Sequence, residues 1–284
     1  MYRILLLTSL AMAAFAANSL LARAALADGT SDPGSFTAIR LVSGAAALAL
    51  LLIGQQGRGA LRGAPGSWRS AFCLFTYAMA FSLAYVRLGA ATGALILFAS
   101  VQGTMLLWSI ARRDHPTMVE ALGLAVAFGA LVYLLLPGLR APDLLGSLLM
   151  IGSGIAWGGY SLRGRGTGDP LLETAGNFIR AATICMPLIP LTMLYGHITS
   201  YGAALAVISG VIASGLGYAI WYRVLPRLSA SLAGTVQLTV PAIAALGAVL
   251  FLSEVLTLRL IIASACILGG VALATLWRKP AKAA

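Results

Sequence analysis

Long apolar runs, each ended by proline, glycine or charged residues, constrain this chain more than any other feature. A helix needs about 20 mainly apolar residues to cross a bilayer. Ten runs of that kind are predicted, at 4–24, 36–54, 69–87, 90–110, 117–136, 142–162, 171–193, 202–222, 229–251 and 257–277. Only 10% of the residues are charged, against about 25% in soluble domains. We therefore expect an all-α integral membrane protein with ten transmembrane helices, because open sheet edges cannot lie in lipid.

The basic residues predict how the chain is oriented. The net charge is +11, but the basic residues lie mostly in short loops between the apolar runs, which favours topology signals over nucleic-acid binding. If the N-terminus is cytoplasmic, 13 of the 19 basic residues fall on the cytoplasmic side. We expect a multi-pass protein of the inner membrane with both termini in the cytoplasm. The start, from Arg3 to Ala27, resembles a signal peptide, but its apolar run is long enough to span, so we predict a retained first helix.

The two halves of the chain share one residue pattern. The stretch Arg227–Leu276 aligns without a gap on Arg87–Leu136, 140 residues earlier, and Arg180 aligns on Arg40 in the same register. A shared offset over this length indicates a duplicated chain. Each half, 1–138 and 139–284, holds five predicted spans, so the second must enter the membrane inverted. Inverted repeats are a signature of secondary transporters, although duplication also builds channels and membrane enzymes.

Several segments resemble a known family. They are the run Gly215–Tyr222, the run Leu228–Ala233, Pro241, the turn at Glu254 and the run Ile267–Val271. Together they resemble the drug/metabolite transporter superfamily, in its EamA-type ten-helix branch. The resemblance implies two halves around a central cavity and export of amino acids and other metabolites. Length and aromatic content are most similar to the bacterial aromatic amino-acid exporters. The first half departs from the pattern, because the run 87–91 lacks the serines found at 229 and 231.

Aromatic residues at helical spacing form the first set of candidate site residues. Tyr77 and Phe81 are four residues apart, and Tyr218 is followed by Trp221 three residues later, so each pair shares a helix face. Such faces can line a path for an apolar or aromatic substrate. Ordinary helix packing is the alternative, as is an interfacial aromatic belt for Trp221, which lies near a span end. Trp157 could stack on a substrate in the same way.

Polar residues inside the spans form the second set, because each is costly without a partner or a wet cavity. Gln102 and Gln237 could bind a zwitterionic substrate or join helices. Arg40 and Arg180 align across the repeat, and a buried guanidinium at either position could hold a carboxylate. Snorkelling is the alternative, and it fits Arg40, near a predicted span end, better than Arg180. The full candidate substrate-binding set is Asn18, Tyr77, Ser82, Gln102, Trp157, Tyr160, Arg180, Tyr218, Trp221 and Gln237, with Pro241 as a hinge.

Missing residue types narrow the chemistry. Mid-span positions hold no Asp or Glu, His115 and His197 fall in predicted loops, and the three cysteines follow no metal-ligand spacing. We expect no metal, no cofactor and no enzymatic activity. The predicted function is a secondary transporter that exports amino acids, with aromatic or other apolar side chains favoured, by alternating access. An exporter of another small metabolite or of an amphipathic drug-like compound is the alternative, and a non-transporting scaffold or channel is the reading from a different class. The partners are the substrate and the lipid bilayer, and the oligomeric state is open, with a monomer compatible.

Overall fold

A computed structural model describes residues 2–57, 59–60, 65–111, 117–136, 141–164, 169–227, 236–237 and 239–276. In this part of the chain the regular structure is helical, and no strand occurs beyond an isolated bridge between Ser31 and Ile198. The α-helices are α1 Tyr2–Ala27, α2 Pro33–Gln56, α3 Trp68–Tyr85, α4 Ala90–Ala111, α5 Met118–Leu135, α6 Leu144–Arg163, α7 Pro170–Cys185, α8 Leu188–Tyr195, α9 Ser200–Ile208, α10 Gly217–Val224, α12 Thr239–Leu252 and α13 Leu258–Leu276. The predicted all-α class is confirmed.

Helices fall in every predicted range, but three ranges differ from the prediction. The seventh is split into α7 and α8, which meet at 53° around Pro187, where a proline lacks the N–H that a continuous helix needs. The eighth carries a π-helical segment, η2 Ser209–Leu216, between α9 and α10. The ninth range begins outside the described residues: Val236 and Gln237 are helical, and α12 is described from Thr239, two residues before Pro241.

Length and composition alone identify fewer spans than ten. The helices Tyr2–Ala27, Pro33–Gln56 and Ser200–Val224 are each long and apolar enough to cross a membrane, and the bent pair Pro170–Tyr195 could be a fourth. Other helices, such as Thr239–Leu252, are apolar but shorter in the part that the structure describes. The chain is thus built for a membrane, and the number of spans stays a prediction.

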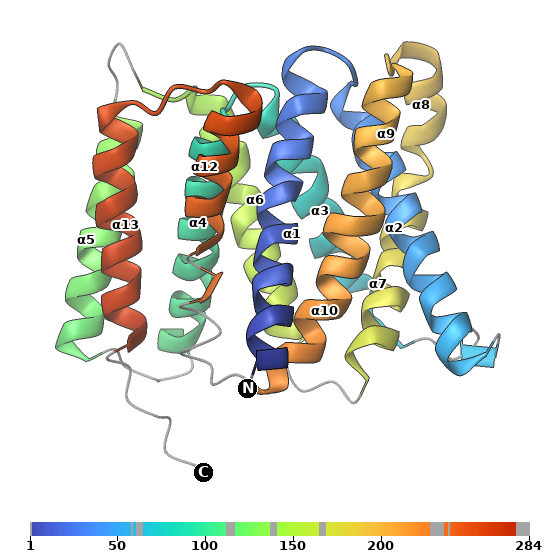
Figure 1. Cartoon of the computed structure of the whole chain (residues 1–284), viewed down its shortest axis with the longest axis horizontal. Coiled ribbons are helices and arrows are strands. Elements are labelled where there is room, and N and C mark those ends of the chain that lie inside the picture. The colour runs from blue at the N-terminus through green and yellow to red at the C-terminus, as the bar shows by residue number, and fades with distance from the viewer. Residues whose placement is uncertain are drawn as a thin grey trace.

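The helices stand side by side in one bundle (Figure 1). The pair α5 and α13 lies at one side, α2 and α8 lie at the other, and α1 runs through the middle between them. The helix α3 packs on α6 and α7, and α10 packs on α1. The beginning of α1 and the end of α13 lie at the same end of the bundle.

Small residues let several helices approach closely. A Cβ built on Gly154 of α6 would lie 2.7 Å from the carbonyl oxygen of Leu97 in α4. One built on Gly44 of α2 would lie 3.0 Å from the carbonyl oxygen of Gly210 in η2. Lipid tails are as apolar as the side chains, so close van der Waals contact of this kind is what holds membrane helices together.

Acidic residues at helix starts serve as caps. Asp143 accepts a hydrogen bond from the backbone N–H of Gly146 at 2.7 Å, and Asp169 accepts from Leu172 at 3.1 Å. Asp32 caps α2 through the N–H of Ser35 and also accepts from the N–H of His197, at 3.0 Å. These carboxylates satisfy backbone donors that a helix start leaves free.

Candidate functional site

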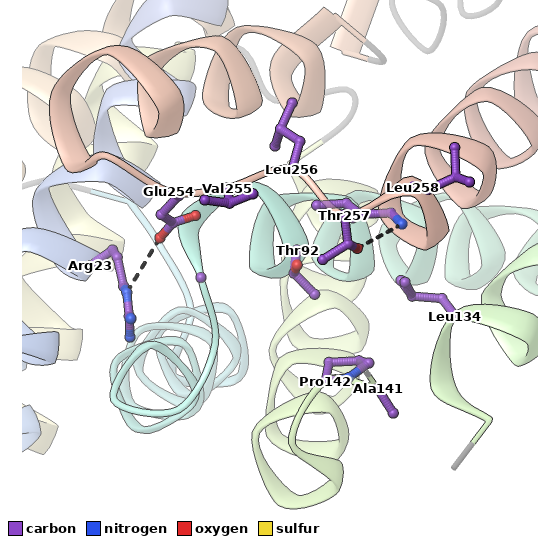
Figure 2. Close-up of a pocket in the computed structure, with 12 residues that line it drawn as sticks. Arg23, Thr92, Leu134, Ala141, Pro142, Glu254, Val255, Leu256, Thr257 and Leu258 are labelled. Atoms are coloured by element: carbon purple, nitrogen blue, oxygen red, sulfur yellow. Dashed lines mark hydrogen bonds and ion pairs between the residues drawn. The ribbon is translucent and has the colours of Figure 1, made fainter. Parts of the chain in front are cut away.

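A cavity of about 540 Å³ lies at the end of the bundle where α1 finishes. Figure 2 shows Arg23 reaching Glu254 across it. Their closest charged atoms, Nε and Oε1, are 3.4 Å apart. Glu254 Oε1 also accepts a hydrogen bond from the N–H of Ala90 at 2.8 Å, and Arg23 donates to the carbonyl of Tyr85 at 3.1 Å. One carboxylate thus ties α1 and the turn between α3 and α4 to the segment between α12 and α13.

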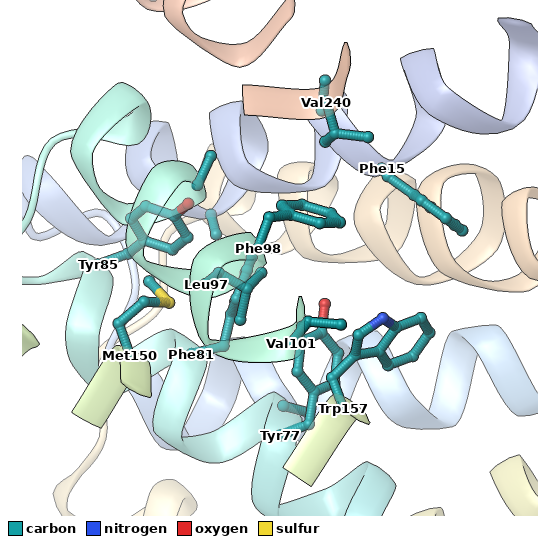
Figure 3. Packing of buried hydrophobic residues seen from close by; sticks show 14 of the residues in the cluster. Phe15, Tyr77, Phe81, Tyr85, Leu97, Phe98, Val101, Met150, Trp157 and Val240 are labelled. Carbon is teal, nitrogen blue, oxygen red and sulfur yellow. The ribbon is translucent and has the colours of Figure 1, made fainter. Parts of the chain in front are cut away.

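A second place, deep in the bundle, gathers aromatic rings from four helices. Trp157 of α6 lies at its centre, with its ring centroid 4.9 Å from that of Tyr77 (Figure 3). The ring centroid of Tyr218 lies 4.8 Å from that of Trp157. Tyr160 and Phe15 complete the surroundings of Trp157 at 5.5 and 6.2 Å. These separations are those of favourable offset and edge-on ring pairs. We call Phe15, Tyr77, Trp157, Tyr160, Tyr218 and Trp221 the aromatic cluster.

The sequence spacing explains how the rings meet. Tyr218 and Trp221 stand on one face of α10, and both rings contact Phe15 of α1, with centroids 5.6 and 6.0 Å away. Tyr77 of α3 reaches Trp157 from the other side, because α3 packs along α6. All six rings are buried, with 7% or less of each residue exposed. In this conformation the aromatic faces therefore contact each other.

A polar network crosses the aromatic cluster. The Tyr77 hydroxyl accepts from Asn18 Nδ2 at 3.3 Å and from Arg40 Nη2 at 3.2 Å. Asn18 Oδ1 accepts in turn from the Ser209 hydroxyl at 2.5 Å, and Arg40 Nε donates to the Ser214 hydroxyl at 3.1 Å. The two serines belong to η2, so the network joins α1, α2 and α3 to the π-helical segment.

Arg40 is the residue that the sequence argument misplaced. The snorkelling interpretation is wrong, because only 1% of Arg40 is exposed. Its guanidinium carbon lies 4.9 Å from the ring centroid of Phe81 and 5.2 Å from that of Tyr77. The alignment of Arg40 with Arg180 was a signal that both deserved equal weight. The structure puts Arg40, not Arg180, beside the rings.

Arg180 has a different environment. Its Nη1 donates to the carbonyl oxygens of Gly176 at 3.0 Å and Pro65 at 3.4 Å. The neighbouring Asn177 accepts from the N–H of Ser67 at 2.9 Å. Both side chains thus hold the segment that enters α3 against α7.

The remaining candidates fall into two groups. Ser82 is buried near Phe81, but its hydroxyl is satisfied by Thr37 at 2.8 Å and the carbonyl of Ala78 at 2.9 Å. Gln102 of α4 has a buried Nε2 without a hydrogen-bond partner among the described residues, and Gln237 is buried with an interaction partner. The structure therefore brings together Asn18, Tyr77, Trp157, Tyr160, Tyr218 and Trp221 of the predicted set.

The residues that the structure describes hold no set of metal ligands. In 2–57, 59–60, 65–111, 117–136, 141–164, 169–227, 236–237 and 239–276, no three His, Cys, Asp or Glu residues gather where they could hold an ion. What the central residues can offer instead is ring surface, hydroxyl and amide groups, and one guanidinium.

Known proteins resemble this chain in sequence and in fold. The model of the EamA-like transporter family matches residues 144–276. An uncharacterized protein of Pseudomonas aeruginosa is 52% identical, over 95% of this chain and 94% of that protein. The uncharacterized transporter YwfM of Bacillus subtilis is 28% identical, over 82% and 81% of the two chains. A solved structure titled "Crystal structure of protein" has a TM-score of 0.66 at 21% identity, covering 96% of this chain and 99% of that one, which shows a shared fold.

Proposed function

This chain belongs to the EamA-like transporter family, and from that premise we propose a secondary transporter that exports amino acids, preferably those with aromatic or other apolar side chains. The general function of such a chain is to transport a small molecule across a membrane as a multi-pass protein. The observation that carries the choice of cargo is the aromatic cluster around Trp157, with the Asn18–Tyr77–Arg40 network beside it.

An aromatic amino acid needs two kinds of contact at one place. Its side chain is best received by rings that stack or meet edge-on, and Trp157, Tyr77 and Tyr218 offer such surfaces. Its ammonium and carboxylate need hydrogen-bonding groups in a site that excludes lipid. Asn18 and the Tyr77 hydroxyl lie next to those rings. Because the rings are buried against each other, binding must replace ring–ring contacts with ring–cargo contacts.

Alternating access would follow from two inverted halves, 1–138 and 139–284. The helix packing supports this division, because a contact between two helices is matched by a contact between their two counterparts in the other half. The helix α3 packs on α6 as α10 packs on α1, and α4 packs on α6 as α12 packs on α1. The helices α2 and α7, and also α5 and α13, pair with their own counterparts. A two-fold axis in the membrane plane gives such a pattern.

The remaining assignments extend the same proposal. The protein lies in the inner membrane, with the bundle end that holds the first residues of α1 on the cytoplasmic side. The Arg23–Glu254 pair closes the opposite, outer end. The proposed route for the substrate also includes Ser82, Arg180, Gln102 and Gln237. Pro241, at the start of α12, serves as the hinge.

Counterflow in proteoliposomes tests the proposal. Vesicles loaded with unlabelled tryptophan should accumulate labelled tryptophan, with a rate that saturates, and phenylalanine and leucine should compete. Absence of counterflow for all three, with sealed vesicles and folded protein, would refute amino-acid transport. Flux that rises linearly with concentration would indicate a channel instead. Competition by amphipathic compounds but not by amino acids would favour the drug-like alternative.

A matched pair of variants on α6 connects the assay to the aromatic cluster. Trp157→Ala should lower counterflow at least tenfold in protein that still purifies. Leu148→Ala, on the same helix but with a side chain that is 56% exposed in the structure, should leave it near the wild-type rate. Transport that falls only in proportion to the folded fraction in Trp157→Ala would show that Trp157 is a packing residue.

A further inference from the structure

The guanidinium of Arg40 is a buried charge whose partners are all neutral. Its Nε and Nη2 donate to the hydroxyls of Ser214 and Tyr77. Among the described residues Nη1 has no hydrogen-bond partner, and no carboxylate forms an ion pair with Arg40. A buried charge is strongly unfavourable unless it is paired and hydrogen-bonded.

Arginines at the bundle ends provide the contrast. Arg23 pairs with Glu254 at 3.4 Å, and Arg87 pairs with Asp143 at 3.8 Å. Arg40 relies on the faces of Tyr77 and Phe81, which attract a cation less strongly than a carboxylate does. These two arginines, which are partly exposed, have a carboxylate beside them, whereas the buried Arg40 has none among the described residues.

The free donors of Arg40 point to one kind of ligand. Of its five N–H groups, the two hydrogen bonds use one on Nε and one on Nη2. Three N–H groups are therefore left, two on Nη1 and one on Nη2, and one from each terminal nitrogen can make a two-pronged contact with a carboxylate. The Tyr218 hydroxyl is buried as well and interacts with the same guanidinium. A guanidinium with spare donors and a phenol hydroxyl thus lie together at the edge of the aromatic cluster.

We propose that Arg40 binds the carboxylate of the cargo and makes a carboxylate obligatory for transport, with the Tyr218 hydroxyl as a second contact. This rests on the proposed function. The cargo class becomes a compound with an acidic group on a short linker from an apolar or aromatic body. Amphipathic cations are excluded, because they would place a second positive charge beside the guanidinium.

A competitor series in wild-type proteoliposomes tests the charge requirement without any mutation. Labelled tryptophan is exchanged against indole-3-propionate, which has the carboxylate but no amine, and against tryptamine and tryptophanamide, which lack the carboxylate. We expect indole-3-propionate to compete, and the other two to need at least tenfold higher concentrations than tryptophan. Equal competition by tryptophan and tryptophanamide would overturn the proposal and leave amino-acid transport standing.

Variants then assign the requirement to Arg40. Arg40→Gln should weaken competition by tryptophan at least tenfold and bring tryptophan and tryptophanamide to the same level, whereas Arg40→Lys should recover part of the preference. Arg87→Gln, a guanidinium that is paired at the bundle end, should keep the full preference. Retention of the preference in folded Arg40→Gln, or its loss in Arg180→Gln alone, would refute the assignment to Arg40.

Failure of the two proposals can be told apart. If folded wild-type protein exchanges none of the tryptophan compounds, the proposed function is refuted, and the proposed role of Arg40 is refuted with it. If tryptophan and tryptamine are exchanged equally well, transport stands and the role of Arg40 falls. Should Arg40→Gln not fold, the wild-type competitor series and Arg40→Lys still decide between these outcomes.

Discussion

Gly210 is a position where one added methyl group should have a large and measurable effect, because it lies beside the polar network. It lies in η2 against α2, and a Cβ there would meet the Ser43 hydroxyl and the Arg40 carbonyl oxygen and lie 3.0 Å from Arg40 Cα. Two of these three atoms belong to the backbone and cannot rotate away. Gly210→Ala therefore has to push α2 and η2 apart, at the residue whose side chain enters the polar network.

The expected magnitude follows from two opposing terms. Overpacking typically costs about 1–3 kcal/mol, and the backbone collision places Gly210→Ala near the upper value. Replacing a helical glycine by alanine returns roughly 1 kcal/mol through helix propensity. The net loss in unfolding free energy is then about 2 kcal/mol. Gly152→Ala in α6 is the matched control, since a Cβ there would meet no atom within 4 Å, and it should gain roughly 1 kcal/mol.

The assay is reversible unfolding of both purified variants in mixed detergent, followed by helicity. We expect the two to differ from each other by about 3 kcal/mol, with opposite signs relative to wild type. Counterflow by Gly210→Ala should also need more tryptophan for half-saturation, because Arg40 moves. Equal stability of the two variants would refute the close approach of α2 and η2.

Three further changes have definite expected outcomes. Trp157→Ala should lower the unfolding free energy by about 3–5 kcal/mol and Trp157→Phe by much less, measured by the same unfolding titration; near-equal losses would show that ring contacts do not hold the aromatic cluster. Glu254→Gln should cost about 1 kcal/mol, with the difference from wild type shrinking in 1 M salt; a salt-independent difference would remove the ion pair as the cause. Partial burial raises the pKa of Asp32, but hydrogen bonds from Ser35, His197 and Gly34 outweigh it, so the folded-state pKa is lowered overall. The contribution of Asp32 to stability is therefore fully present above the unfolded-state pKa of about 4. It is lost as the pH falls through the lower folded-state pKa. Thermal unfolding should therefore show a smaller acid-induced loss in Asp32→Asn than in wild type, and identical acid profiles would contradict this.

Local pattern predicted much of the fold and part of the candidate site. Apolar runs and their breaks placed a helix in each expected range, because a helix in lipid must satisfy its own backbone. Spacings of three and four residues put Tyr77 with Phe81 and Tyr218 with Trp221 on single faces, and those faces do meet around Trp157. Periodicity is a local property, so it carries over directly.

The environment of Arg40 was missed through a small error in a helix boundary. The expected span began at 36, whereas α2 begins at Pro33 with Asp32 as its cap. Three residues correspond to about 4.5 Å along a helix, enough to change a side chain that reaches the surface into one that does not. The Asp32–Pro33 pair was the available signal, since an acidic cap followed by proline is typical of a helix start.

Other features depend on distant parts of the chain and leave no local trace. The pairing of Arg23 with Glu254 joins residues more than 200 positions apart. The bend at Pro187 and the π-helical η2 are two further departures from a straight α-helix. Proline indicates that a bend is possible, but nothing in the run 209–216 distinguishes a π-helix from an α-helix.

The wide winding of η2 has a mechanical consequence. Each residue advances an α-helix by 100° about its axis, and a π-turn takes up one residue more than an α-turn. If the π-turns moved along Ser209–Leu216 or relaxed to α-turns, the helix after them, α10, would rotate about its axis and shift along it. Tyr218 and Trp221 stand on α10, directly after η2, while Ser209 and Ser214 within it hold Asn18 and Arg40. A shift in backbone hydrogen bonding within η2 would therefore rotate the aromatic residues of α10 about the helix axis, without any change in the tilt of the surrounding helices.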